Sequence, residues 1–118
     1  MQEDPLLIGV DAGTSVVKAV VFDTCGNERA SHECPMPLGR PEPLWIEQDM
    51  EQLLDLVKFC LGKVVANLGD RRRQLAGLGI TSTGDGTWII DRAGKPVPKS
   101  DGTTEGTTVD WRGRLKKK

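Results

Sequence analysis

The sequence predicts an α/β fold in which one helix packs against a mixed sheet, with the elements in the order β-β-β-α-β-β. Two observations lead to this prediction. Three short segments with strand character follow one another with brief turns between them, which is typical of an antiparallel meander. A stretch with apolar residues at helical spacing then leads into another apolar run, which is typical of a helix that returns the chain to the same sheet.

The first two predicted strands enclose a polar turn. Residues 6–10 form a short apolar run, and residues 16–22 form a second one that is rich in β-branched side chains. The five residues 11–15 between them have the length of a hairpin loop, and Gly13 allows the chain to turn. Another turn then leads into a more polar third strand over residues 28–34.

A proline-rich loop precedes the predicted helix. Four prolines between residues 35 and 43 favour an extended segment. Asp49, with Gln52 three residues later, resembles a capping box with Asp in the Ser/Thr role, and Gly69 suits a left-handed C-cap. Apolar residues recur at helical spacing between these signals, so we expect a helix over about residues 50–68 with one apolar face toward the sheet.

Two strands and a tail complete the predicted order. Residues 75–82 form an apolar strand, and residues 87–97 indicate a strand with a turn at residues 93–94. From residue 99 the chain is rich in Gly and Thr and has little periodicity. We therefore expect a partial domain over residues 1–98 and a divergent, disordered tail over residues 99–118.

The composition argues against several classes of function. The chain has 118 residues and a formal net charge of −1, so nothing indicates nucleic acid or an anionic membrane as a partner. The apolar runs are far shorter than a membrane span, and the N-terminus lacks the features of a secretory signal. The three cysteines have no metal-like spacing, which indicates free thiols in a reducing cytoplasm.

The turn between the first two strands has residues that suit a phosphate site. Gly13, Thr14 and Ser15 can direct backbone N–H groups and hydroxyls at an oxyanion, because glycine allows a close approach. Asp11 beside a phosphate requires a cation between them, and Mg²⁺ suits that role. Lys18 adds positive charge from the second strand. An ordinary hairpin with a turn-favouring aspartate is the alternative interpretation.

Four stretches, in the same order, resemble the FGGY carbohydrate kinases, members of the actin and hexokinase ATPase superfamily. They are the opening "IGVDAGTSVVKAVVFD", then "WIEQD", "GLGITSTGDGTWIID" and "DRAGKPV". The resemblance covers about residues 6–98 and implies a partial N-terminal domain with a ribonuclease H-like α/β fold. Within the family, "GDGTW" is most similar to the erythritol kinase branch.

The resemblance implies a site for ATP and Mg²⁺. Asp11 is the expected metal-linked acid, holding Mg²⁺ through water. Gly13, Thr14 and Ser15 are the expected phosphate-contacting turn. Lys18 stands where the family carries a basic residue.

The resemblance also implies a site for a polyol or sugar. Gly84 and Asp85 align with the pair that holds substrate hydroxyls, and a carboxylate there can accept hydrogen bonds from vicinal hydroxyls. A turn aspartate between two glycines is the alternative interpretation of Asp85. Trp45 is expected to line the polyol pocket. Glu47 and Gln48 are expected only to shape the loop before the helix.

The resemblance weakens after residue 98. Family members continue with the rest of the first domain, a second aspartate motif that supplies the catalytic base, and an adenosine-binding domain. We therefore expect part of a kinase that transfers phosphate from MgATP to a polyol or ketose hydroxyl, with no catalytic base of its own and no activity alone. The alternative is a small non-catalytic module that binds phosphate or nucleotide, or regulates a partner. Another ATPase of the superfamily is not expected to combine "WIEQD" with the substrate loop.

Overall fold

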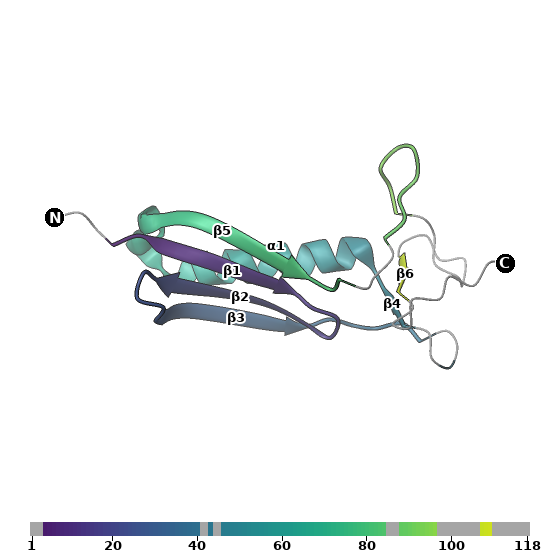
Figure 1. Ribbon diagram of the computed structural model, residues 1–118, viewed down its shortest axis with the longest axis horizontal. Coiled ribbons are helices and arrows are strands. Elements are labelled where there is room, and N and C mark those ends of the chain that lie inside the picture. Colours follow the sequence, from purple (N-terminus) through teal and green to yellow (C-terminus); the bar gives the residue numbers. More distant parts are fainter. Residues whose placement is uncertain (1–3, 41–42, 44–45, 85–87, 97–106, 110–118) are drawn as a thin grey trace.

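The computed structural model describes residues 4–40, 43, 46–84, 88–96 and 107–109. Its elements are β1 (Leu6–Ala12), β2 (Val16–Asp23), β3 (Glu28–Pro35), β4 (Ile46–Gln48), α1 (Met50–Asn67), the 3₁₀ helix η1 (Gly69–Gln74), β5 (Leu75–Ser82) and β6 (Thr107–Val109). One sheet has the strand order β3-β2-β1-β5, and α1 lies along one of its faces (Figure 1). Strands β1 to β3 are antiparallel and β5 is parallel to β1, so the sheet is mixed as predicted.

Helix α1 begins and ends close to the predicted positions. The Asp49 carboxylate accepts a hydrogen bond from the N–H of Gln52 at 2.9 Å, which satisfies one of the free donors of the first turn. Asn67 is the last helical residue. Gly69 follows with a φ of 54°, so the predicted left-handed glycine is confirmed. No helix in the described part of the chain is long and apolar enough to cross a membrane.

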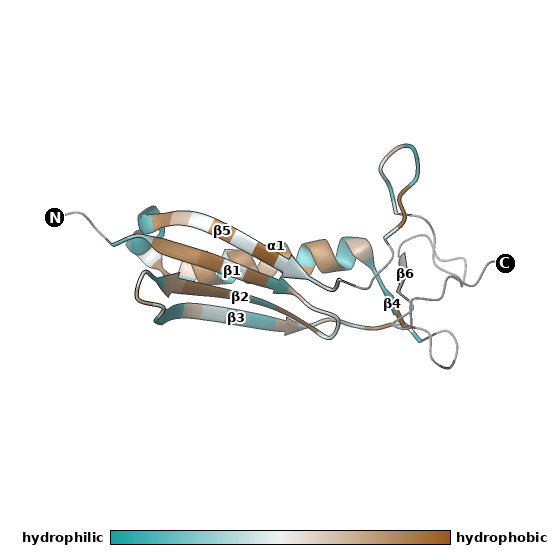
Figure 2. Ribbon diagram, in the orientation of Figure 1, coloured by the Kyte–Doolittle hydropathy of each residue, from teal (hydrophilic) through white to brown (hydrophobic). Residues whose placement is uncertain are grey.

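The core lies between α1 and the sheet. Residues of β1 and β2 alternate between this core and the opposite face, as the pleat of a strand requires, and Figure 2 shows the apolar bands. The Cys60 thiol of α1 donates to the carbonyl of Val17 at 3.5 Å. Burial raises the pKa of this thiol to about 11, so it stays protonated at neutral pH. The core residues are Leu6, Ile8, Val10, Val17, Ala19, Val21, Met36, Cys60, Val64 and Leu68.

The first turn is shorter than the sequence predicts. Strand β1 continues through Asp11 to Ala12, so only residues 13–15 connect it to β2. The antiparallel ladder explains the difference, because it still pairs Asp11 with Lys18 after the apolar run has ended. A polar side chain on the open face of a sheet does not stop the backbone from pairing. Asp11 therefore lies in a strand, which fixes its backbone more firmly than a loop would.

The predicted order lacks the two short strands β4 and β6. Strand β4 occupies residues that were expected to form a loop before the helix. Strand β6 lies within the predicted tail, residues 99–118, and pairs antiparallel with β4. The other residues of the tail lie outside the described residues. The division of the chain at residue 98 stays a prediction.

The strand predicted over residues 87–97 does not form in the described part of that segment. Ile90 and Pro96 make a single antiparallel bridge, and Gly94 turns the chain between them with a φ of 77°. The Asp91 carboxylate accepts hydrogen bonds from two backbone N–H groups of this turn at 2.8 and 2.9 Å. These bonds favour a turn over a strand. The predicted turn is confirmed and the predicted strand is wrong.

Candidate functional site

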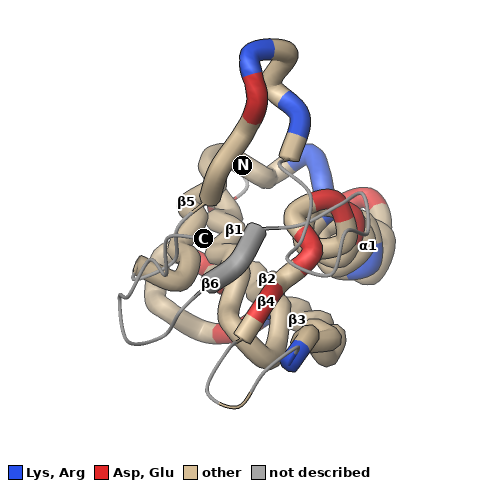
Figure 3. Tube along the Cα trace, turned by 90° about the vertical axis from the view of Figure 1, so that its right-hand side faces the viewer, with Lys and Arg blue, Asp and Glu red and all other residues tan. Residues whose placement is uncertain are grey.

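The candidate site lies where β1 and β5 end side by side. These two parallel strands have their carboxyl ends at the same edge of the sheet, and α1 begins at that end of the molecule (Figure 1). Ligand sites of open α/β sheets are found beyond such strand ends. Thr14, after β1, and Thr83, after β5, join the two segments through a hydrogen bond between their hydroxyls at 3.0 Å. In Figure 3, which looks onto this end, acidic and basic residues are intermixed.

The turn after β1 is closed by a hydrogen bond of its own backbone. The N–H of Gly13 donates to the carbonyl of Val16 at 3.0 Å. A side chain at Gly13 would place its Cβ only 2.6 Å from that same oxygen, so the turn requires glycine. The N–H of Gly13 is therefore already used within the turn, and the role of Gly13 in a phosphate site stays a prediction.

The other two N–H groups of the turn remain available. Those of Thr14 and Ser15 donate to no atom of the described residues. The three carbonyls of the turn are all held from the protein side. The side-chain amide of Gln48 donates to the carbonyls of Gly13 and Thr14 at 3.1 and 2.9 Å. The N–H of Met36 donates to the carbonyl of Ser15 at 2.8 Å. The turn can thus offer two N–H donors and a serine hydroxyl to an anion.

Asp11 stands beside this turn on the face of the sheet opposite α1. Its ladder partners are Lys18 on β2 and Thr81 on β5, and the three residues line one open groove of about 450 Å³. The Lys18 ammonium is 3.8 Å from the Glu33 carboxylate, and the two side chains are 44% and 64% exposed. Such a surface pair is weak, so Lys18 can turn toward an anion in the groove at little cost.

The donors present fit the phosphate end of a magnesium nucleotide. Within the described residues, no group of three or more His, Cys, Asp or Glu side chains gathers to form a metal cage. Mg²⁺ does not require one, because it is commonly held by one or two carboxylates together with water and phosphate oxygens. The single exposed carboxylate of Asp11, next to two N–H donors and a hydroxyl, has this chemistry.

Comparison with known protein families decides which family this architecture represents. The chain matches the FGGY family of carbohydrate kinases, N-terminal domain, over residues 6–118. The chain belongs to the FGGY family. It is 32% identical over 98 residues to the glycerol kinase of Limosilactobacillus reuteri, covering 82% of this chain and 20% of that protein. It is 36% identical over 88 residues to the xylulose kinase of Klebsiella pneumoniae, covering 75% of this chain and 18% of that protein.

Solved structures of FGGY kinases share the fold. The xylulose kinase from Rhodospirillum rubrum is similar with a TM-score of 0.76 and 22% identity, over 89% of this chain and 20% of that one. Plasmodium falciparum glycerol kinase with ADP is similar with a TM-score of 0.70 and 18% identity, over 88% of this chain and 20% of that one. The predicted fold class is confirmed. The chain spans about a fifth of the length of the curated relatives that it matches.

The structure gathers most of the residues that the FGGY resemblance singled out. Asp11, Lys18 and the turn of Gly13, Thr14 and Ser15 come together at one end of the sheet. Gly84 is exposed in the turn that follows β5. Asp85 and Trp45 lie outside the described residues, and their proposed contacts with substrate stay predictions.

Sequence reasoning missed several residues in and around the site. Glu47 and Gln48 were expected only to shape a loop, yet they are 2% and 1% exposed, and Gln48 contacts the Gly-Thr-Ser turn directly. Thr81 in β5 and Thr83 directly after it were not identified as site residues, because the strand is mainly apolar. A signal was present for each pair. Two polar residues stood next to the helix cap, and two threonines stood two positions apart at a strand end, where they share one face.

Proposed function

We propose that this chain forms the phosphate and metal side of the catalytic cleft of an ATP-dependent carbohydrate kinase. The reaction is the transfer of a phosphoryl group from MgATP to a hydroxyl of a polyol or ketose. One observation carries the proposal. The turn after β1 has two N–H groups with no acceptor among the described residues, and it lies next to an exposed aspartate at the carboxyl end of a parallel strand.

Each of these residues has a role that phosphoryl transfer requires. The reaction depends mainly on positioning and on electrostatic stabilisation of the transferred group. Thr14 and Ser15 bind phosphate oxygens through their N–H groups and the serine hydroxyl. Asp11 would hold magnesium through water, and the ion would neutralise phosphate charge. Lys18 adds positive charge from the neighbouring strand. These strand and turn positions are held by the sheet, so the donors are in place before the ligand arrives.

We propose that the acceptor is a polyol or sugar held by Gly84 and Asp85, with Trp45 against its carbon face. Support comes from the place of Gly84, which directly follows Thr83 and so lies beside the Gly-Thr-Ser turn. The relatives named glycerol kinase and xylulose kinase agree with this class of acceptor. The "GDGTW" loop favours an erythritol-like polyol within that class.

The proposal is tested by titrating the ¹⁵N-labelled chain with MgATP and following the backbone amide shifts. We expect the amides of Thr14 and Ser15 to move most. Asp11→Asn should weaken the affinity for MgATP about tenfold or more, because a charged hydrogen bond contributes roughly 1.5–3 kcal/mol and about 1.4 kcal/mol corresponds to tenfold. The substitution removes the charge with little change of shape.

Two controls separate this site from general effects of charge. Asp55→Asn makes the same change on the exposed side of α1 and should leave the affinity unchanged. In excess EDTA, wild type and Asp11→Asn should bind ATP equally weakly, since no metal links the carboxylate to phosphate. Equal affinity of wild type and Asp11→Asn for MgATP in the presence of magnesium would rule out the proposed metal role.

A further inference from the structure

We propose that Gln48 is a positioning residue that turns the N–H groups of Thr14 and Ser15 toward the bound phosphate. The inference rests on the proposed function, since it assigns a supporting residue to the same site. Gln48 is the last residue of β4 and stands immediately before Asp49, the N-cap of α1. Its side chain is almost completely buried, although glutamine is usually exposed.

The contacts of the Gln48 amide leave one orientation for it. Its nitrogen donates to the carbonyl of Gly13 at 3.1 Å and to the carbonyl of Thr14 at 2.9 Å. Both partners are acceptors, so the amide must present its NH₂ group, and both hydrogens are used. The amide oxygen is buried and has no hydrogen-bond partner among the described residues. An unpaired buried oxygen is unfavourable, so the two donated bonds are the reason for a glutamine here.

These two bonds fix the direction of two peptide planes. The described peptide bonds are all trans, and in a trans peptide the C=O and the following N–H point in opposite directions. Gln48 holds the carbonyls of Gly13 and Thr14 toward the protein, so the N–H groups of Thr14 and Ser15 must face away from it. Met36 holds the third carbonyl of the turn in the same way.

The outward N–H groups form a preorganised anion site. A turn without the Gln48 bonds is free to rotate its peptide planes, and a rotated plane presents a carbonyl oxygen to the phosphate in place of an N–H group. Donors that are already aimed need no reorganisation when the anion binds, which improves affinity. Gln48 never touches the ligand in this arrangement. Its effect passes entirely through the backbone of the turn.

The experiment compares three variants of the full chain with wild type. Gln48→Met keeps the length of the side chain and removes both donors. Gln48→His restores one N–H donor. Gln52→Met makes the same change at an exposed position of α1 and serves as the matched control. The probe is inorganic pyrophosphate with Mg²⁺, titrated into ¹⁵N-labelled protein. The order of the turn without ligand is measured from the ¹H–¹⁵N heteronuclear NOE of its amides.

We expect Gln48→Met to lower the NOE of the Thr14 and Ser15 amides while the amides of β1 and β2 keep theirs. Its affinity for magnesium pyrophosphate should fall about tenfold, as for the loss of aimed hydrogen bonds to a charged group. Gln48→His should recover part of both losses, and Gln52→Met should match wild type. A variant that merely loosened the core would lower the NOE of the strands as well, and histidine would not restore the turn.

The two readouts separate this inference from the proposed function. If wild type shows no response to pyrophosphate but Gln48→Met still loses the order of the turn, the phosphate site fails and the positioning role of Gln48 stands. If Gln48→Met matches Gln52→Met in both the NOE and the affinity, Gln48 does not orient the turn and the inference is overturned.

Discussion

Gly13 is the residue whose replacement most directly tests the geometry of the turn. A Cβ at this position would lie 2.6 Å from the carbonyl oxygen of Val16, which accepts the hydrogen bond that closes the turn. We expect Gly13→Ala to lower the free energy of unfolding by about 1–3 kcal/mol, the usual cost of forcing extra volume into a packed site. Urea denaturation of the purified variant measures it.

The matched substitution is Gly62→Ala on α1. A Cβ at Gly62 meets no atom within 4 Å, and alanine favours a helix over glycine by roughly 0.5–1 kcal/mol. This variant should therefore be more stable than wild type by about that amount. The opposite signs of the two Gly→Ala changes distinguish a steric effect at the turn from a general effect of the methyl group. A Gly13→Ala protein as stable as wild type would mean that the turn can move aside.

At the level of single residues, the sequence predicts local contacts and misses distant ones. Asp49 and Gln52 lie three positions apart, so the helix cap is visible in the sequence and is confirmed. The contact of Gln48 with Thr14 joins residues 34 positions apart, and the contact of Thr14 with Thr83 spans 69 positions. No local pattern encodes such pairs, because they depend on how the sheet brings strand ends together.

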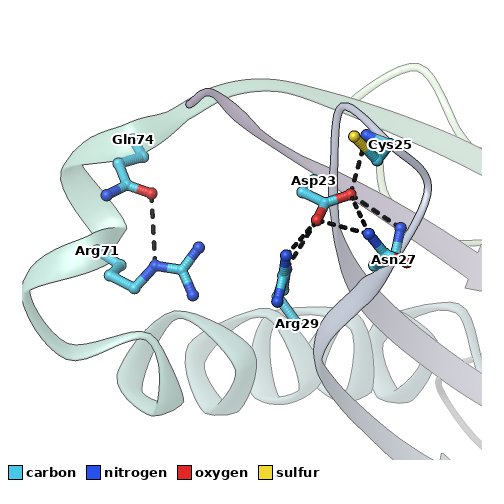
Figure 4. A network of polar contacts seen from close by, with 6 residues as sticks. All are labelled: Asp23, Cys25, Asn27, Arg29, Arg71 and Gln74. Atoms are coloured by element: carbon cyan, nitrogen blue, oxygen red, sulfur yellow. Dashed lines mark hydrogen bonds and ion pairs between the residues drawn. The ribbon is translucent and has the colours of Figure 1, made fainter. Parts of the chain in front are cut away.

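The β2–β3 hairpin is stabilised by one buried carboxylate at its turn. Asp23, 9% exposed, accepts hydrogen bonds from the N–H groups of Cys25 and Asn27, each at 2.9 Å, from the Asn27 side chain, and from Arg29 (Figure 4). The Asn27 amide is the main cause that holds the pKa of Asp23 well below its ordinary value of 3.8, with the Asn27 N–H and Arg29 acting in the same direction. The ionised form is thus the one that closes this turn.

The depressed pKa gives the hairpin a stability that depends on pH. A carboxylate with a lower pKa in the folded chain stabilises it at pH values above its unfolded pKa near 3.8, and this contribution declines as the pH falls toward the folded pKa. We expect Asp23→Asn to be less stable than wild type at pH 7 by an amount that stays constant down to about pH 5. The difference should shrink as the pH falls below about 4. Urea denaturation of both proteins between pH 7 and pH 3 measures it.

Comparing the two proteins at each pH isolates the effect of Asp23, because all other acidic groups are common to both. A difference in unfolding free energy that stayed constant over the whole range would show that the Asp23 carboxylate is not held ionised by the hairpin. A difference that grew toward low pH would reverse the sign of the expected shift.

At the level of elements, the longer helix and strands can be predicted from the sequence, and the shortest strands cannot. Helix α1 and strands β1 and β2 carry apolar periodicity over 7 to 18 residues, so their apolar positions reveal them. Strands β4 and β6 have three residues each, which is too few for any alternation to show. The apolar residues before Asp91 suggested a strand. The chain turns there instead, because the Asp91 carboxylate accepts hydrogen bonds from the backbone of the turn that follows it.

At the scale of the whole molecule, β5 is an edge of the main sheet within the described residues. Leu78 and Ile80 of β5 have the same orientation as the core residues of β1, yet they are 51% and 63% exposed because α1 packs over β1, β2 and β3. In Figure 1, α1 runs behind the strands without covering all of β5. The apolar pattern of β5 predicted a strand correctly. It could not show how much of that strand α1 covers, because coverage depends on the whole sheet.

The chain of 118 residues is expected to transfer no phosphate by itself. In the proposed arrangement its described residues supply phosphate and metal contacts on one side of a cleft. The chain spans about a fifth of the length of its curated relatives. Phosphoryl transfer also needs a residue that takes the proton of the attacking hydroxyl and a cleft that closes around the reactants. Asp11 is committed to the metal and Asp85 to the substrate in the proposed arrangement, so neither is available as that base. The measurement is a labelled-ATP assay of the purified, monodisperse chain over a panel of polyols and ketoses, with the xylulose kinase of Klebsiella pneumoniae as positive control. Turnover above background that disappears in Asp11→Asn would show that this chain alone completes the active site.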